Sequence, residues 1–559
     1  MSRFHPPESL KGLIQYNVAL VLGIFVLLEI WRPCYFLTDD NLDAGLPFFT
    51  EMGRHLKAGT SPFISDYLFG GNYNYLRDAQ YFNWHPFYFI VSLLADTPAR
   101  FIILDLIAFF FIMVTAVGFV RLAWFLREEF HLALSSLRLT FYTLSFVYSS
   151  YILTTGASWV NSLGDQSALP WLALGILERK WKVGTGMIAL FALHQLLCGQ
   201  FALTISNLIF LSLFAVGIAL QRKSWWPLLA WGLGNLAAVL IASPLLIPAM
   251  QGFFDSSRSQ GILTLDTLGR YAVPLGTAPF SFFLGNFSKV YEFWTNPNFN
   301  GDLEFPGNSA LMACAAAWCL IPALISPVRW RYMEMLCLGL TVIALVLVIR
   351  PDFVSEFMLQ VPILRSMRWP FREILQLLFF FHLFLILRPQ IGTQKVQDSI
   401  ALGSLFVFLA PLPISSVPSL NLLGPDRQAL FSGQADRFWE RVKREQLKPG
   451  DQIVSAITSK VWTASNRDLA YSLMGTADFP AYFKVPTLSG YSQTAPRNQL
   501  PLKIVPTLSF GSFGTHQIPA LLAAAPHVKI IVVQSADPLI VTLYEQGKPP
   551  VDLTPYLAP

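Results

Sequence analysis

The sequence predicts a polytopic α-helical membrane protein with a smaller α/β domain at its C-terminal end. Three observations lead to this fold class. Of the 559 residues, 54% are hydrophobic and 13% are charged, whereas a soluble chain carries about 25% charged residues. The mean hydropathy of the chain is +0.49. Apolar runs of membrane-spanning length recur up to residue 416 and are missing from the sequence beyond it.

The apolar runs predict about eleven membrane spans, since about 20 apolar residues cross the hydrocarbon core. The first run is expected to stay in the protein as a helix, because no small-residue cleavage site follows it. The fourth and fifth runs are short enough to be half-embedded. The expected spans are 13–33, 99–125, 137–154, 165–178, 183–200, 202–221, 226–249, 307–326, 332–349, 371–388 and 398–416.

Basic residues in alternate joints between these spans predict the orientation. Lys and Arg occur in the joints ERKWK, QRKSWW, PVRWR and RPQIGTQK and in the joint 121–138. The short joints 155–164 and near residue 200 contain neither. The positive-inside rule therefore places the N-terminus in the cytoplasm, and an odd number of spans places the C-terminal region outside.

The chain divides into a membrane module, 1–416, and an extracytoplasmic domain, 417–559. The membrane module has two long outer loops, 34–98 and 250–306. In the first loop, the helical period of 44–57 predicts an interfacial helix. In the C-terminal domain, DQIVSAI and VKIIVVQ predict strands, and DRFWERVKREQL predicts an amphipathic helix.

Three carboxylates, Asp39, Asp40 and Asp43, follow the first span in the stretch LTDDNLD. An acidic pair there either ends the span in water, or serves as a general base or metal ligand at the membrane surface. The loop of about 60 residues that it opens favours the functional interpretation. The choice between Asp39 and Asp40 stays open, and Asp43 is expected to orient the substrate or the interfacial helix.

Four further residues of the outer joints are candidates for the site. Asp165 is the only charge in GASWVNSLGDQSALP, where it is either a metal ligand or the N-cap of the next span. Asp302 and Glu304 precede a later span and either contact the substrate or are solvated turn residues. His85, in the first loop, is taken as a further substrate contact.

An arginine cluster in a late outer joint breaks the positive-inside pattern. Arg365, Arg368 and Arg372 are spaced as one helical face that leads into a span. Guanidinium groups bind phosphate through paired hydrogen bonds, so a lipid phosphate headgroup is one expected ligand. Pairing with Glu356 or Glu373 is the alternative.

Other classes of site are not expected. The five Cys residues lack the spacing of a zinc site or a disulfide framework. The net charge of +5 is small for this length, so a nucleic-acid partner is not expected. His194 and His382 lie in apolar spans, but no chain of ionisable residues crosses the bilayer.

The layout resembles the GT-C glycosyltransferases, which use polyprenyl-phosphate-linked sugars. The matching features are TDD after the first span, the long first outer loop and the extracytoplasmic tail. RSMRWPFRE resembles the Arg-Pro-Arg region of the bacterial subgroup that glycosylates teichoic acids. LEFPGNSALMACAAAW and LSGYSQTAP also resemble segments of that subgroup. The likeness covers most of the chain, through short motifs in matching order.

The resemblance implies inverting sugar transfer in a bacterial inner or plasma membrane, from a polyprenyl-phosphate donor to an outer glycan, lipid or protein. Asp40 or Asp39 would serve as base or orienter, and the three arginines would hold the donor phosphate. A divalent metal bound by Asp165 with Asp40 is an option, although no DxD pattern occurs in that joint. A lipid or glycan transporter or flippase, and a non-catalytic envelope assembly protein, are the alternatives.

Overall fold

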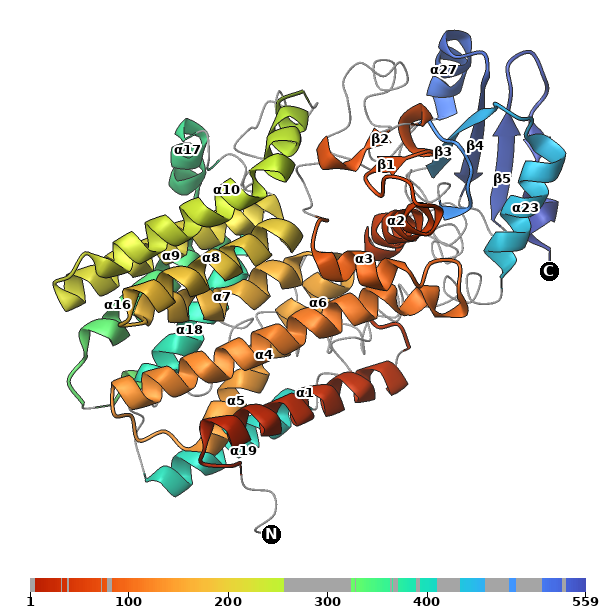
Figure 1. Cartoon of the computed structure of the whole chain (residues 1–559). Helices are drawn as coiled ribbons and strands as arrows, with labels where there is room; N and C mark the ends of the chain where they lie inside the picture. The colour runs from red at the N-terminus through yellow and green to blue at the C-terminus, as the bar shows by residue number, and fades with distance from the viewer. Residues whose placement is uncertain are drawn as a thin grey trace.

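The computed structural model shows a mainly helical protein (Figure 1). Six helices of the described part are long and apolar enough to cross a membrane, as expected for a polytopic helical membrane protein. They are Leu10–Ile30, Pro98–Glu129, Trp181–Cys198, Phe201–Arg222, Trp226–Gly252 and Tyr332–Ile349. The structure describes residues 6–31, 33–37, 40–71, 73–77, 83–255, 323–326, 328–361, 364, 370–388, 393–409, 433–457, 482–488, 515–534 and 539–558.

Most of the expected spans correspond to helices. Among the described residues, the helices at the expected spans are α1 (Leu10–Trp31), α4 (Ile103–Glu129), α5 (Ser136–Val147), α6 (Ser150–Ser158), α7 (Ser162–Leu177), α8 (Trp181–Cys198), α9 (Phe201–Arg222), α10 (Trp226–Asp255), α16 (Tyr332–Ile349), α18 (Ile374–Leu387) and α19 (Gln394–Leu409). The expected spans 307–326 and 398–416 lie largely or partly outside the described residues.

One expected span, 137–154, is wrong as a single helix. The chain forms α5 and α6, which are separated by Tyr148 and Ser149. Ser149 adopts a non-helical conformation, and its hydroxyl accepts a hydrogen bond from the N–H of Ile152, as an N-cap does. Other Ser and Thr residues of the same run lie inside the helices, so the sequence does not single out this break. The expected loop 156–170 is likewise mostly helix, because α7 already begins at Ser162.

The long helices pack side by side, with α4 and α7 in the middle of the described bundle (Figure 1). Every residue of α18 is buried, in keeping with its unbroken apolar sequence. By contrast, Leu236 and Leu240 of α10 are 53% and 63% exposed. A face of exposed leucines on a spanning helix is typical of contact with lipid tails. Pro244 and Pro248 lie inside α10, near the end that bends in Figure 1.

The basic joints gather at one end of the bundle. Glu129, at the end of α4, forms ion pairs with Arg179 at 2.7 Å and with Arg222 at 3.8 Å. At the same end, Arg388 after α18 binds Glu334 of α16 at 3.0 Å. The joints predicted to be cytoplasmic are thus neighbours in space. The membrane side that this end faces is a prediction from the positive-inside rule.

The first outer loop lies at the opposite end of the bundle. It contains α2 (Leu46–Ala58), the short strands β1 (Ile64–Ser65) and β2 (Tyr73–Asn74), and α3 (Pro86–Ser92). The predicted helix at 44–57 is confirmed as α2, and its apolar residues Leu46, Phe49 and Met52 are at most 1% exposed.

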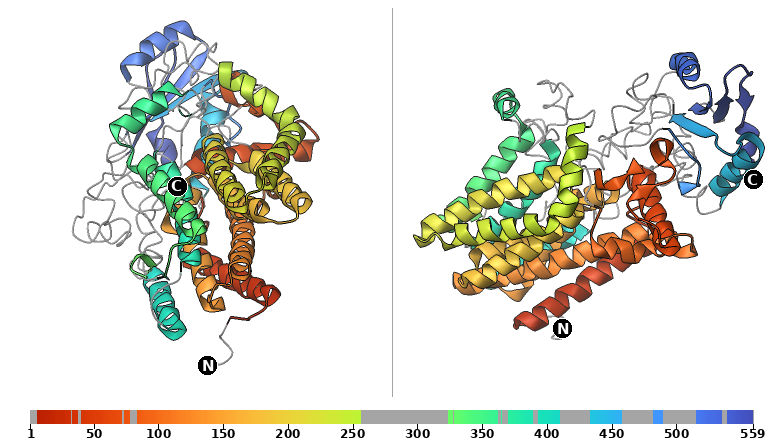
Figure 2. Two further views of the ribbon diagram at one scale, coloured as in Figure 1. Left: turned by 90° about the vertical axis from the view of Figure 1, so that its left-hand side faces the viewer. Right: turned by 45° about the horizontal axis from the view of Figure 1, so that its top comes forward.

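The C-terminal region forms a small mixed sheet against this loop (Figures 1 and 2). Its strand order is β3-β4-β5-β6, with β3 parallel to β4 and the other pairs antiparallel. The two predicted strands and the predicted helix are confirmed as β3, β4 and α23. The elements are α23 (Gln434–Gln446), β3 (Gln452–Ile457), α27 (Ile518–Ala524), β4 (Val528–Gln534), β5 (Ile540–Tyr544) and β6 (Val551–Asp552).

Side chains of the first loop hold the C-terminal region in place. Arg54 of α2 binds Asp96 at 2.8 Å and donates a hydrogen bond to the carbonyl of Tyr482 at 3.0 Å. The Tyr482 ring lies near two guanidinium groups, with Arg54 at 5.9 Å and Arg100 at 5.6 Å from its centroid. Arg100 also pairs with Asp436 of α23 at 3.2 Å. The first loop and the tail therefore share one end of the molecule, as the predicted topology requires.

Candidate functional site

The chain that leaves α1 is fixed by two carboxylates. Glu29, in the last turns of α1, accepts hydrogen bonds from the backbone N–H groups of Cys34 at 2.8 Å and Tyr35 at 3.3 Å. Asp105, in the first turn of α4, accepts the N–H of Phe36 at 2.9 Å. These contacts satisfy backbone N–H groups of the turn that follows α1. They direct the following residues toward the joint between α6 and α7.

Asn41 fastens the acidic stretch to that joint. Its side-chain amide donates to the carbonyls of Phe36, Gly156 and Ala157 at 2.8–2.9 Å. Its carbonyl oxygen accepts the N–H of Val160 at 2.8 Å. The side chain is 3% exposed, so these bonds are shielded from water. Asn41 thereby sets the position of Asp40 relative to the α6–α7 joint.

Asp40 and Arg372 meet at the indole of Trp159. The Nε1 atom of Trp159 donates to Oδ2 of Asp40 over 2.6 Å. The Cζ atom of Arg372 lies 5.3 Å from the centroid of the same indole, within the range of a cation–π contact. A carboxylate from the first outer loop and a guanidinium from the segment before α18 thus share one aromatic side chain. The prediction that both lie at one end of the molecule agrees with this geometry.

Arg372 is 7% exposed and lies in a cluster of acidic residues. Its charge acts favourably on the carboxylates of both Asp165 and Glu373. Glu373 also accepts a hydrogen bond from Ser206 of α9. The neighbouring Arg350 follows α16, and burial lowers the pKa of its guanidinium to about 10, although Glu373 opposes the shift. Phosphate binding and pairing with Glu373 are therefore both compatible with the position of Arg372.

Asp165 is fully buried and holds the turn between α8 and α9. Its Oδ1 accepts hydrogen bonds from Gln195 at 2.6 Å and Thr204 at 2.8 Å, and its Oδ2 accepts the N–H of Gln200 at 2.6 Å. A Cβ atom at Gly199 would lie 2.7 Å from Oδ1, so only glycine fits beside the carboxylate. Three donors on one carboxylate favour a structural role over metal binding.

The N-cap interpretation of Asp165 is wrong for its own helix. Asn161 occupies the N-cap position of α7, and Asp165 lies one turn further on. Within the described residues, no three His, Cys, Asp or Glu side chains are placed to hold a metal ion together. The described residues therefore give no support from geometry to the divalent metal.

The other predicted site residues are placed as follows. His85 is the N-cap of α3, and Asp43 lies in the π-helix Asn41–Gly45. The side chain of Asp43 is outside the described part. Asp39, Asp302, Glu304, Arg365 and Arg368 lie outside the described residues.

His85 takes part in a buried chain of hydrogen bonds. Its Nε2 lies 3.2 Å from Nδ1 of His194, whose Nε2 lies 2.7 Å from the hydroxyl of Ser167. The Ser167 hydroxyl donates to the carbonyl of Gly164 and the N–H of Phe87 donates to Nδ1 of His85, which assigns neutral tautomers to both rings. Burial lowers the pKa of His85 to about 4, in agreement with a neutral ring.

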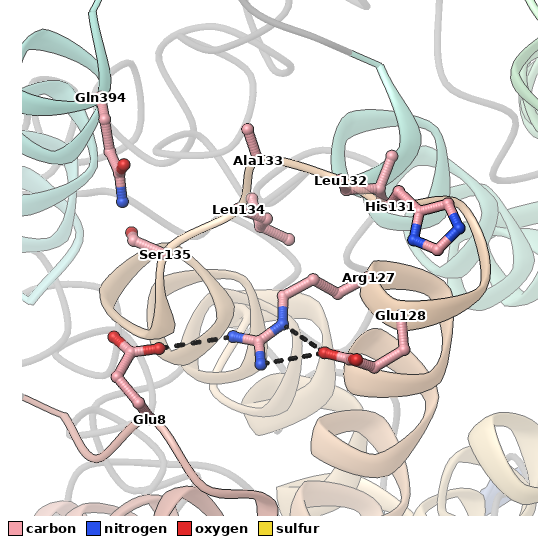
Figure 3. Close-up of a pocket in the computed structure, with 9 residues that line it drawn as sticks. All are labelled: Glu8, Arg127, Glu128, His131, Leu132, Ala133, Leu134, Ser135 and Gln394. Carbon is pink, nitrogen blue, oxygen red and sulfur yellow. Dashed lines mark hydrogen bonds and ion pairs between the residues drawn. The ribbon is translucent and has the colours of Figure 1, made fainter.

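Two hollows that are lined by described residues alone do not include Asp40 or Arg372. One, of about 530 Å³, lies beside His85 and His194 and is lined mainly by apolar side chains of α4, α7 and α8. The other, of about 350 Å³, lies at the basic end of the bundle. There Arg127 forms ion pairs with Glu8 and Glu128 (Figure 3), which leaves little free charge for a ligand.

Comparisons with known proteins add no further assignment. No family model, no curated protein and no solved structure matches the chain. The site is therefore interpreted from its own geometry.

Asn41 and Trp159 are the functional candidates that the sequence interpretation missed. Asn41 directly follows the acidic pair, and Trp159 lies in a joint with no Lys or Arg. An aromatic side chain in a short outer joint was the one signal that pointed to Trp159. Both residues act through partners that are distant in the sequence. Asn41 and Ala157 are 116 residues apart, and Asp40 and Trp159 are 119 residues apart.

Proposed function

We propose that the protein is an integral membrane glycosyltransferase that moves a sugar from a polyprenyl-phosphate donor to an acceptor on the extracytoplasmic face. The observation that supports it most is the meeting of Asp40 and Arg372 at Trp159. A carboxylate and a guanidinium at one end of a bundle of spanning helices are the two groups that this reaction needs at the membrane surface.

Each group has a defined task in an inverting transfer. Asp40 orients the acceptor hydroxyl and takes its proton as the oxygen attacks the anomeric carbon. The bond from that carbon to the phosphate oxygen then breaks, and the lipid phosphate leaves with an added negative charge. Arg372 stabilises this charge, together with Arg365 and Arg368 in the proposal. The Trp159 N–H holds Oδ2 of Asp40 and so fixes the orientation of the carboxylate.

The proposed orientation uses the arrangement of the two ends. The basic joints gather around Glu129 and Glu334, whereas Asp40, Arg372 and the C-terminal sheet lie at the other end. In the proposal, the positive-inside rule puts the site on the outer face, and the membrane is a bacterial plasma membrane, as the family resemblance implies. There the donor reaches the site from the bilayer, and the glycan, lipid or protein acceptor reaches it from outside.

A transporter or flippase is the second candidate, because a polar network lies buried between the helices. Asn207 of α9 donates to the backbone carbonyl of Asp165 at 3.2 Å and accepts a hydrogen bond from Gln376 of α18 at 2.7 Å. Buried polar groups within a membrane module often mark a substrate path. Asp165, Asn207 and Gln376 are each 0% exposed, however, so the network joins helices and leaves no open path between them.

The test is the transfer of labelled sugar from polyprenyl-phosphate sugars by the purified protein. We expect Asp40→Asn to abolish transfer and Arg372→Ala to lower it strongly. Asp66→Asn is the matched control, since Asp66 lies in the same loop with 62% of its side chain exposed. Full activity of Asp40→Asn would contradict the proposed role. Lipid or glycan flux in liposomes without transfer would favour the transporter, and neither activity would favour an assembly protein.

A further inference from the structure

The short helix α17 (Asp352–Gln360) carries an exposed apolar face at the site end of the bundle. It follows α16 and is set apart from the long helices in all three views (Figures 1 and 2). Val354 and Met358 belong to a buried apolar cluster with Ile205 near the start of α9. The helix is thus seated on the outer ends of the bundle.

The exposed part of α17 is divided into two kinds of surface. Phe353 and Phe357 are 67% and 58% exposed and stand one helical turn apart, so their rings lie next to each other. Asp352 and Glu356 are also exposed and form the adjoining strip, about 100° round the helix. One face of the helix thus carries two phenyl rings, and the adjoining face carries two carboxylates. This pattern is typical of a helix at a boundary between apolar and aqueous surroundings.

The two spanning helices that hold α17 also carry exposed apolar side chains. Leu208 of α9 and Val342 and Ile343 of α16 are 42–49% exposed on two of the spanning helices. These residues lie on the two helices whose outer ends hold α17. Exposed pairs of phenylalanines are costly in water, whereas lipid tails accept them.

We infer that α17 is an interfacial helix that rests on the outer leaflet, with Phe353 and Phe357 among the acyl chains and Asp352 and Glu356 toward water. The partner of this surface is the lipid bilayer itself. The inference does not depend on glycosyl transfer, and it predicts the depth of α17 and of Arg350 just before it. A helix held at the surface would keep these residues level with lipid phosphates.

Spin-label accessibility in nanodiscs tests this placement. Single cysteines are introduced as Phe353→Cys, Phe357→Cys and Glu356→Cys after replacement of the five native cysteines. Labels at 353 and 357 should collide with oxygen, which dissolves in lipid, more often than with a water-soluble nickel chelate. The label at 356 should show the opposite preference. Nickel preference at all three positions would overturn the inference, as would protection of 353 and 357 from both reagents, which indicates a protein cover.

A second measurement covers the case in which a cysteine variant does not fold. Phe353→Trp in otherwise unaltered protein should add fluorescence that lipids brominated near the headgroup quench. The matched variant is Glu356→Trp, whose added fluorescence these lipids should quench less. Equal quenching at the two positions would contradict the inference that Phe353 faces lipid and Glu356 faces water.

Discussion

The indole N–H of Trp159 donates to Oδ2 of Asp40 over 2.6 Å. This hydrogen bond links the segment between α6 and α7 to the first outer loop. The hydrogen bond ends on a carboxylate that the proposed reaction uses directly. Trp159 also faces Arg372 with its ring. The two functions of this side chain, donor and aromatic surface, can be separated by mutation.

Trp159→Phe removes the N–H and keeps an aromatic ring for Arg372. A hydrogen bond to a charged group contributes about 2 kcal/mol, so transfer should fall roughly thirtyfold. The KM for the donor should change less, because the ring surface is retained. The matched control is Trp171→Phe, which removes an N–H bonded to the carbonyl of Val114 at 3.0 Å. Equal losses in both variants would argue against a special role for Trp159.

Asn41→Ala should destabilise the protein more than most single substitutions. It removes the hydrogen bonds of Asn41 to three carbonyls and to the N–H of Val160, at a cost of about 2–4 kcal/mol. The measurement is the midpoint of thermal unfolding in detergent. In the control Asn235→Ala, a single hydrogen bond to Trp231 is lost, so the shift should be smaller. An unchanged midpoint for Asn41→Ala would show that the hydrogen bonds of Asn41 contribute little to stability.

Arg54→Ala should loosen the C-terminal region from the first loop. The guanidinium binds Asp96, donates to the carbonyl of Tyr482 and lies over the Tyr482 ring. A double-mutant cycle with Tyr482→Ala should give a coupling energy of about 1 kcal/mol. Limited proteolysis should also cut the tail faster. Arg441→Ala, which removes a contact with Tyr556 inside the tail, is the control and should leave docking intact.

Stability should fall as the pH drops below the ordinary pKa of histidine. Burial lowers the pKa of His85 to about 4, whereas the unfolded chain takes up a proton near 6.5. Between these values the unfolded state binds more protons, so stability is full above about pH 6.5 and declines toward pH 4. At about pH 5 the loss is at most about 2 kcal/mol.

Thermal unfolding at about pH 7.5 and about pH 5 measures this effect. His85→Asn keeps an N-cap for α3 and should lose less stability on acidification than the unmodified protein. His527→Asn, at an exposed position, should behave like the unmodified protein. An equal acid sensitivity in all three proteins would contradict the assignment to His85.

The sequence predicted those helices and strands whose residue pattern is complete within a short segment. The helical period places one face of α23 in the core, and the same period identified α2, although the residues of α2 from Leu46 to Gly53 are all buried. The break between α5 and α6 was missed because its cap, Ser149, resembles other hydroxyl residues of the run, such as Thr143 and Ser145, that lie inside a helix. The parallel pairing of β3 with β4 joins segments far apart in the chain, and no local pattern encodes it.

The charged residues of the candidate site could be predicted from the sequence, but their contacts with other side chains could not. Asp40 and Arg372 stood out because their charges were unusual for their positions. Asn41 and Trp159 carry no charge and act through partners in distant segments. Asp165 was taken as a metal ligand or a helix N-cap, because its actual partners Gln195 and Thr204 belong to later helices.

The carboxylate of Asp165 has a consequence for how the protein is assembled during synthesis. A segment with an acid in its first turn and Pro170 in its interior is a poor candidate for insertion into a bilayer by itself. The donors that make this acid tolerable belong to α8 and α9, which leave the ribosome later. Insertion of α7 should therefore wait for the hairpin that follows it, and a chain truncated after residue 180 should leave this segment outside the membrane.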